Sequence, residues 1–368
     1  MNLASLIEKA KSENVELDIK SACFAMGFVA GQEAMKSETD RPICVTGGTG
    51  FLGSWIVKML YDKGLTVHCT TRSSKKVGYV KALCPDGDRL KIFTGCDLLK
   101  DGSFDDAIRG CDAVIHSASP FFTQGGTMDN LVKPALEGTR NVLDSCVRFR
   151  VKRVVLTSST AAVYAGHGKW DKDHVYTEDD WSPEERMIKC ENWYCLSKTR
   201  AEKLAWDKAK SPGCPFRLAA LNPTLISGPL LKDQPHFNTS CAALVGYLDG
   251  TKSEIENGTK AIVDVRDVAE AHVIAALDKS LRLKCWGQRT LLIGACPTWV
   301  DILKEVKAVA PKDAEIPTKV SSEIKKQSLG APPPHPTLYD GSRGEALYCP
   351  FVSVQASRSV RDPGDFDT

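Results

Sequence analysis

The chain has 368 residues, of which 42% are hydrophobic and 26% are charged, the composition of a folded globular protein. Its 48 basic and 46 acidic side chains nearly cancel, which gives no reason to expect a nucleic-acid partner. The longest uncharged apolar stretch near the N-terminus, residues 21–31, is shorter than the ~20 residues that a membrane-spanning helix needs. We therefore expect a cytoplasmic protein that binds neither nucleic acid nor membrane.

The 14 cysteines are spread along the chain without any Cys-x-x-Cys pair. Several of them, including Cys23, Cys44, Cys69 and Cys241, lie in apolar runs, where a reduced thiol behaves as a small hydrophobic side chain. This spacing favours neither a zinc site nor a disulfide framework. We predict buried structural thiols in a reducing compartment, and no metal site.

Residues 1–40 are interpreted as an N-terminal extension, in which a short helix is indicated by apolar residues on one helical face. Beyond it, short apolar strands are predicted at 42–46, 65–70, 90–93, 113–116 and 154–157, and helical patterns separate them, at 51–60 and 131–147 among others. Near-continuous apolar strands that alternate with helices are typical of a buried parallel sheet with helices on both faces. The predicted fold class is α/β, a Rossmann-type doubly wound parallel sheet.

The alternation of strands and helices weakens after about residue 223. We predict a Rossmann domain over 41–225 and a smaller mixed substrate-binding lobe over 226–368, of which about 259–285 returns to the Rossmann domain. Within this lobe the sequence APPPHP at 331–336 predicts a loop, because proline is excluded from helix interiors and central strands.

The strongest local motif is the sequence TGGTGFLG at 46–53, between the first predicted strand and the first predicted helix. Either Gly47 or Gly48 can begin a glycine series that continues with Gly50 and Gly53. Glycines permit the tight turn and let the backbone approach a pyrophosphate, while the helix N-terminus offers N–H groups to the anion. In this position the motif predicts a dinucleotide site rather than a flexible loop.

The second strand is followed by the sequence TTRSSKK at 70–76. A site for NAD would place an acid here to bind the ribose 2′-hydroxyl, whereas this segment has no acid and has three cations, Arg72, Lys75 and Lys76. Cations suit an adenosine 2′-phosphate, so the segment favours NADPH over NADH. Asp97, after the third strand, fits either a contact with the adenine amino group or an ordinary turn.

Tyr194 and Lys198 stand four residues apart at the start of a predicted helix, which puts both side chains on one helical face. A nearby ammonium group favours the phenolate and lowers the pKa of a tyrosine, which can then transfer a proton near neutral pH. The hydroxyl-rich sequence TSST at 157–160 ends the preceding strand, at the edge where open α/β sheets bind ligands. Spacing alone leaves Ser158, Ser159 and Thr160 open as the partner hydroxyl.

These motifs together resemble the extended short-chain dehydrogenase/reductase superfamily from about residue 42 to 310. Within it, the chain is similar to the group of dihydroflavonol 4-reductases, cinnamoyl-CoA reductases and fungal methylglyoxal or ketone reductases. The matching pieces are VTGGTGFLGSW at 45–55, VIHSASP at 114–120, VVLTSS at 154–159, NWYCLSK at 192–198, LNPTLISGP at 221–229 and VDVRDVAEAH at 263–272. One departure is Leu196-Ser197, where cinnamoyl-CoA reductases have Tyr-Gly, and it bears on the substrate more than on the chemistry.

The resemblance implies roles for individual residues. Ser159 would be the catalytic serine, Tyr194 the proton donor and Lys198 its partner on the nicotinamide ribose. Residues implied to bind NADP(H), besides Tyr194 and Lys198, are Gly47, Thr49, Gly50, Phe51, Leu52, Gly53, Arg72, Asp97, Leu98, Ser117, Ala118 and Pro223. His116 is interpreted as a residue of the pocket wall.

The sequence therefore predicts an enzyme, an NADPH-dependent oxidoreductase that reduces an aldehyde or ketone and works as a monomer or homodimer. Its partner would be a small-molecule carbonyl substrate, and phenolic thioesters, flavonoid-like ketones and small α-dicarbonyls all remain open. Two alternatives are an NAD-dependent nucleotide-sugar epimerase or dehydratase, which uses the same fold and the same three residues, and a non-catalytic NADP-sensing protein. The cationic segment at 72–76 disfavours the first, and the presence of both Tyr194 and Lys198 disfavours the second.

Overall fold

A computed structural model describes residues 41–84, 88–120, 125–164, 174–234, 239–310, 314–321 and 338–344. Its main feature is a seven-stranded sheet in the order β10-β7-β5-β4-β1-β2-β3. The strands are β1 (Ile43–Thr46), β2 (Val67–Thr71), β3 (Leu90–Thr94), β4 (Ala113–His116), β5 (Arg153–Thr157), β7 (Arg217–Pro223) and β10 (Arg289–Leu292). Every pairing in this sheet is parallel, so all seven strands end at the same edge.

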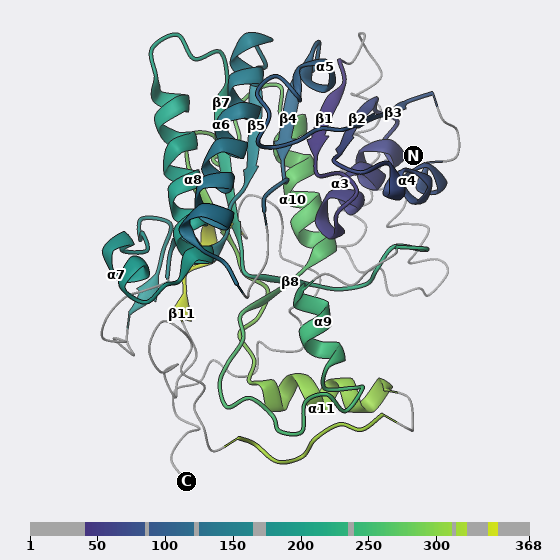
Figure 1. Ribbon diagram of the computed structural model, residues 1–368, viewed down its shortest axis with the longest axis vertical. Coiled ribbons are helices and arrows are strands. Elements are labelled where there is room, and N and C mark those ends of the chain that lie inside the picture. The colour runs from purple at the N-terminus through teal and green to yellow at the C-terminus, as the bar shows by residue number, and fades with distance from the viewer. Residues whose placement is uncertain are drawn as a thin grey trace, which may run out of the picture. The chain divides into compact units, whose positions relative to one another are not determined.

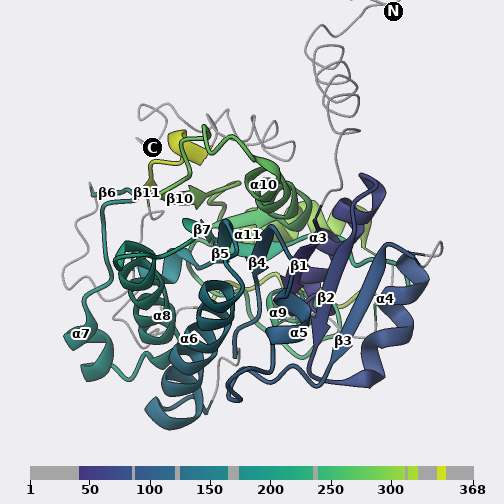
Figure 2. The same ribbon diagram turned by 90° about the horizontal axis from the view of Figure 1, so that it is seen from above.

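Helices cover both faces of the sheet (Figure 2). On one face lie α3 (Phe51–Asp62) and α10 (Val265–Leu277), which pack against each other. On the other lie α5 (Asp105–Ile108), α6 (Lys133–Arg148) and α8 (Trp193–Lys210). The central strands are buried along their whole length, which is why they appear in the sequence as continuous apolar runs. This arrangement confirms the predicted doubly wound parallel sheet.

A smaller mixed part of the chain adjoins the carboxyl edge of the sheet (Figure 1). It contains the parallel pair β8 (Leu225–Ser227) and β9 (Ile262–Asp264), together with α9 (Thr239–Val245) and α11 (Trp299–Val309). Its own apolar cluster is built from Tyr247, Ile255, Trp299 and Leu303. Such a lobe was predicted, whereas the exact division at residue 225 stays a prediction.

The remaining elements are short. They are a 3-10 turn at Ser74–Lys76, α4 (Val77–Leu83), a π-helical turn at Met128–Val132 that leads into α6, a 3-10 turn at Thr160–Ala162, α7 (Glu184–Lys189), and the two-residue strands β6 (Val175–Tyr176) and β11 (Leu338–Tyr339), which pair with each other in parallel. No helix among the described residues is long and apolar enough to cross a bilayer.

The five predicted strands are present, and their boundaries differ from the prediction by at most two residues. The second strand begins at Val67, not at Leu65, because the amide of Leu65 donates to the carbonyl of Leu60 and still belongs to the end of α3. Strands β7 and β10 were not predicted. Cys44, Cys69 and Cys241 are buried as expected, while Cys23, the extension 1–40 and the proline-rich loop at 331–336 lie outside the described residues.

Candidate active site

A cleft of about 1190 Å³ opens at the carboxyl edge of the sheet. Because the strands are parallel, the loops that follow β1, β2, β4, β5 and β7 meet there. Every residue predicted for the cofactor or for catalysis lines this cleft: Gly47, Thr49, Gly50, Phe51, Leu52, Gly53, Arg72, Asp97, Leu98, Ser117, Ala118, Ser159, Tyr194, Lys198 and Pro223. The structure thus brings together side chains that are up to 176 residues apart in the sequence, from Gly47 to Pro223.

The glycine turn after β1 is closed tightly on itself. Gly47 has a φ of +66°, a conformation that favours glycine, and its carbonyl accepts from the amide of Gly50 at 2.9 Å. A Cβ atom on Gly53 would stand 2.2 Å from that same carbonyl oxygen, so only glycine fits there. The N-cap of α3 is Gly50, and no side chain caps it. The first turn of α3 therefore presents backbone N–H groups to the cleft without a competing side-chain oxygen, as a site for phosphate does.

The segment after β2 brings two cations to the same cleft. Arg72 and Lys76 both line it, and Arg72 is exposed to solvent. Asp97 and Leu98 line it from the end of β3, and the Asp97 carboxylate accepts from the amide of Leu99 at 3.0 Å. Asp97 therefore has the turn role that the sequence left open, and its position in the cleft also agrees with the alternative role near an adenine.

The turn after β4 lines the cleft through Ser117 and Ala118, whereas His116, interpreted from the sequence as a pocket-wall residue, is buried and does not line it. The Thr46 hydroxyl accepts from the amide of Ala118 at 3.1 Å and lies 2.9 Å from Nδ1 of His116. Burial, together with the charge of Lys198, lowers the pKa of His116 to about 3, so this imidazole is neutral at physiological pH. His116 acts here as a fixed hydrogen-bonding group beneath the turn that carries Ser117 and Ala118.

Tyr194 and Lys198 lie on the first two turns of α8, whose N-cap is Asn192. The Asn192 side chain accepts from the amide of Cys195 at 3.1 Å and so caps the helix. Ser159 and Tyr194 both line the cleft, and the Ser159 side chain acts to lower the pKa of Tyr194. The neighbouring hydroxyls are engaged elsewhere, since Ser158 donates to Glu202 at 2.6 Å and Thr160 donates to the carbonyl of Pro223 at 3.4 Å. Of the three hydroxyls that spacing left open, Ser159 is the one that acts on Tyr194.

The pKa values of Lys198 and Tyr194 are shifted in opposite directions from their ordinary values. Burial lowers the pKa of Lys198 to about 8, and the charge of Glu202 partly opposes this shift. Burial raises the pKa of Tyr194 well above its ordinary value, while the Ser159 side chain opposes that shift. We expected the ammonium of Lys198 to lower the pKa of Tyr194, and instead desolvation of the phenolate dominates. Tyr194 consequently carries its proton at neutral pH.

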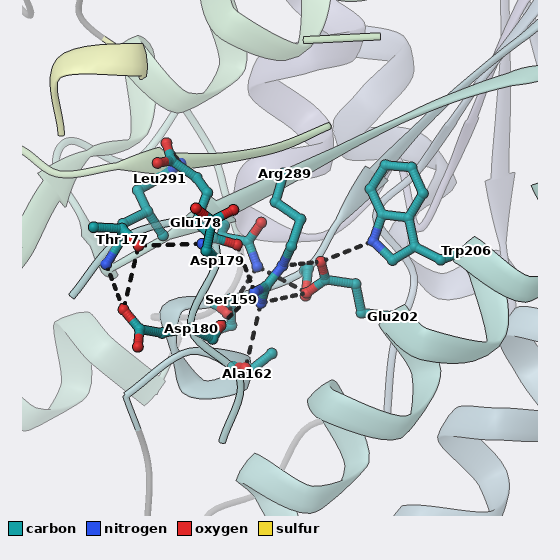
Figure 3. Close-up of polar contacts among 12 residues, drawn as sticks. Ser159, Ala162, Thr177, Glu178, Asp179, Asp180, Glu202, Trp206, Arg289 and Leu291 are labelled. Carbon is teal, nitrogen blue, oxygen red and sulfur yellow. Dashed lines mark hydrogen bonds and ion pairs between the residues drawn. The ribbon is translucent and has the colours of Figure 1, made fainter. Parts of the chain in front are cut away.

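A buried ion pair between Glu202 and Arg289 was not predicted (Figure 3). Glu202 follows Lys198 by one helical turn, and its side chain is 0% exposed. One of its oxygens accepts from Nε of Arg289 at 2.7 Å, and the other accepts from Nδ2 of Asn222 at 2.8 Å. The Asn222 amide also donates to the carbonyl of Ser159 at 3.1 Å. The pair therefore connects α8 and β10 to the backbone of Ser159.

Further residues that sequence reasoning missed line the other end of the cleft. They are Thr224, Leu225 and Ile226 after β7, Thr259, Lys260 and Ala261 before β9, and the two tyrosines Tyr164 and Tyr339. Glu202 could have been found from its spacing, since Tyr194, Lys198 and Glu202 recur every four residues. Nothing in the sequence connects Tyr339 to this site, because it stands 145 positions after Tyr194.

Comparison with known proteins places this geometry in a family. The family model "NAD dependent epimerase/dehydratase family" matches residues 43–283. The chain belongs to this family. The matched range begins at β1 and ends just after α10, so it contains the glycine turn, Ser159, Tyr194 and Lys198. It confirms the predicted extended short-chain dehydrogenase/reductase membership.

Curated proteins that are similar to this chain include reductases. The chain is 40% identical to cinnamoyl-CoA reductase 1 of Petunia hybrida over 242 residues, which is 65% of this chain and 70% of the relative. It is 35% identical to dihydroflavonol 4-reductase of Gerbera hybrida over 249 residues, 65% of this chain and 66% of the relative. These two are representatives of the groups that the sequence motifs resemble.

Solved structures of similar fold include two that contain NADPH. Yeast methylglyoxal/isovaleraldehyde reductase Gre2, complexed with NADPH, has a TM-score of 0.71 and 29% identity, covering 83% of this chain and 92% of that one. Gre2 from Candida albicans in complex with NADPH has a TM-score of 0.70 and 27% identity, covering 83% and 93%. The relatives and these structures bear out the expected NADP-dependent oxidoreductase.

Proposed function

We propose that this protein reduces an aldehyde or ketone with NADPH, with Tyr194 as the proton donor. The proposal rests on three features that line one cleft: an uncapped glycine turn, two cations after β2, and Ser159 together with Tyr194 and Lys198. Each part suits one part of the reaction, namely the pyrophosphate, the 2′-phosphate and the carbonyl oxygen.

The residues present fit a bound NADPH. The backbone amides at the start of α3 would bind the pyrophosphate, with Gly53 leaving the space that a Cβ would fill. Arg72, with Lys76 beside it, would hold the 2′-phosphate. Lys198 would hold the nicotinamide ribose, and Pro223 would lie against the nicotinamide. When bound, this cofactor supplies the hydride for the reduction.

The chain itself supplies the proton and the electrostatic stabilisation. Tyr194 holds a proton on Oη at neutral pH because its pKa is raised, and it gives this proton to the carbonyl oxygen as negative charge develops there. Ser159 donates a hydrogen bond to the same oxygen. Lys198, charged below a pH of about 8, then stabilises the tyrosinate that proton donation leaves behind. Residues such as Ile226, Thr259 and Lys260, which line the cleft, would shape the pocket for the rest of the substrate.

The proposal is tested by following NADPH oxidation at 340 nm with methylglyoxal, aromatic aldehydes, dihydroflavonols and hydroxycinnamoyl thioesters, with NADH in parallel. We expect turnover of at least one member, and a preference for NADPH over NADH. Tight NADPH binding without turnover of any member would contradict a reductase and favour an NADP-sensing role. Protein that retains NAD through purification and does not consume NADPH would favour a nucleotide-sugar epimerase or dehydratase.

A further inference from the structure

A short C-terminal segment contributes to the substrate end of the cleft. Residues 338–344, which we call the strap, lie beyond the range matched by the family model. Its strand β11 pairs in parallel with β6, and the amide of Asp340 donates to the carbonyl of Tyr176 at 2.9 Å. Two-residue strands are only marginally stable by themselves, so further contacts must hold the strap in place.

Those contacts come from the same network that supports the active site. Nη1 of Arg343 donates to the carbonyl of Arg289 at 3.3 Å, and Nε of Arg343 lies 4.0 Å from a carboxylate oxygen of Glu178. Glu178 is buried and accepts from the amide of Leu291 at 3.1 Å; it appears beside Arg289 in Figure 3. A Cβ on Gly344 would stand 2.4 Å from the Leu291 carbonyl oxygen, so the strap backbone packs directly on β10.

The strap places the side chain of Tyr339 in the cleft. Tyr339 lines the cleft together with Thr160, the residue that follows Ser159. Its ring meets the ring of Tyr164 edge-on, with centroids 6.1 Å apart and an interplanar angle of 86°. Tyr164 also lines the cleft. Two phenol rings therefore form one wall beside the Ser159–Tyr194 pair.

Leu338, the residue before Tyr339 on the strap, differs from Tyr339 in where its side chain lies. Leu338 belongs to the same two-residue strand, yet it is 40% exposed and lies outside the cleft lining. Alternate residues of a strand point to opposite sides, so the pairing with β6 determines which of the two enters the cleft. Phenol rings attract other aromatic rings in offset or edge-on arrangements and can also donate a hydrogen bond.

We propose that Tyr339 is a specificity-determining residue that contacts the substrate and favours carbonyl compounds that carry an aromatic ring. This inference rests on the proposed function only for the identity of the cleft as the carbonyl site. Tyr339 would bind the ring of the substrate, while Ser159 and Tyr194 bind the carbonyl oxygen. Small aliphatic carbonyl compounds would not reach Tyr339 and would not depend on it.

The test measures binding of 4-hydroxycinnamaldehyde to the full-length protein saturated with NADP⁺, in which no reduction takes place. We expect Tyr339→Ala to weaken binding by roughly tenfold or more, and Tyr339→Phe, which keeps the ring, by less. Leu338→Ala is the matched control and should leave the dissociation constant unchanged. Thermal unfolding of all three variants identifies any loss that comes from strap detachment alone.

Turnover separates this inference from the proposed function. With NADPH, Tyr339→Ala should lower kcat/KM for the aromatic aldehyde by a similar factor and leave kcat/KM for methylglyoxal within about twofold. Equal dissociation constants for the wild type and Tyr339→Ala, or equal loss for both substrates, would overturn the role of Tyr339. If the wild type binds the aromatic aldehyde with the expected dependence on Tyr339 but reduces no carbonyl compound, the proposed function fails and the role of Tyr339 as a ligand contact stands. A wild type that does not bind the aldehyde at all overturns the inference.

Discussion

Replacing Glu202 tests how much the buried ion pair between Glu202 and Arg289 stabilises the fold around the active site. Glu202 and Arg289 have side chains that are 0% and 7% exposed, and their atoms approach to 2.7 Å. Glu202→Gln keeps the size of the side chain but leaves the guanidinium of Arg289 buried without an opposite charge. Removing one partner of a buried pair costs about 3–5 kcal/mol, so we expect a loss of this size in the free energy of unfolding.

The same substitution should change the titration of Lys198. The charge of Glu202 raises the pKa of Lys198 and so opposes the larger effect of burial. Glu202→Gln therefore shifts the pKa of Lys198 further down, and the alkaline limb of the pH–rate profile should move to lower pH. A loss of stability alone would not produce this shift, so the profile distinguishes the positioning role of Glu202 from a purely structural one.

The assay is equilibrium unfolding in urea for four proteins: the wild type, Glu202→Gln, Arg289→Met and the double variant. We expect the double variant to be more stable than the sum of the two single losses predicts, by about 1–3 kcal/mol. Asp62→Asn is the control, because Asp62 pairs with Lys58 at the surface, where an ion pair contributes about 0–1 kcal/mol. A free energy of unfolding for Glu202→Gln within about 1 kcal/mol of the wild-type value would show that the ion pair does not stabilise the fold in this way.

The remaining predictions concern the cofactor site and pH. Arg72→Asp should lower affinity for NADPH by roughly tenfold or more and shift preference toward NADH, because a charged hydrogen bond contributes about 1.5–3 kcal/mol; unchanged selectivity in a kcat/KM comparison would contradict the assignment. Gly53→Ala should weaken NADPH binding by at least roughly tenfold in a fluorescence titration, since the new Cβ would stand 2.2 Å from the carbonyl oxygen of Gly47. Burial lowers the pKa of Lys198 to about 8, so Lys198 loses its charge as the pH rises through that value, and kcat/KM should fall above about pH 8. A rate that is level from pH 7 to pH 10 would exclude Lys198 as the group that must be charged.

Much of the fold could be predicted from the sequence because the central strands are buried on both faces. Strands such as β1 and β4 consist of buried residues throughout, and the apolar run therefore marks them. The glycine turn was equally visible, since close backbone contact at Gly53 admits no other residue. Strand β10 was missed because Arg289 at its start is a buried charge, and a charge in the sequence argues against a buried strand until its partner is known.

The residues of the site that escaped prediction depend on long-range contacts. The role of Glu202 depends on its ion pair with Arg289, which is 87 residues further along the chain. Tyr339 reaches the cleft only because β11 pairs with β6. The direction of the Tyr194 pKa shift also required the structure, because spacing gives the distance to Lys198 but not the degree of burial.

The role of Tyr194 as proton donor is tested by comparing the wild type with Tyr194→Phe, which removes one hydroxyl group from the cleft. NADPH oxidation at 340 nm is measured with the best substrate of the panel, and the NADPH dissociation constant is measured for both proteins. We expect Tyr194→Phe to lose turnover by at least about 10²-fold, the lower range for a positioned proton donor, and to bind NADPH as the wild type does. Turnover that survives this substitution would show that Tyr194 is not the proton donor and would contradict the central claim.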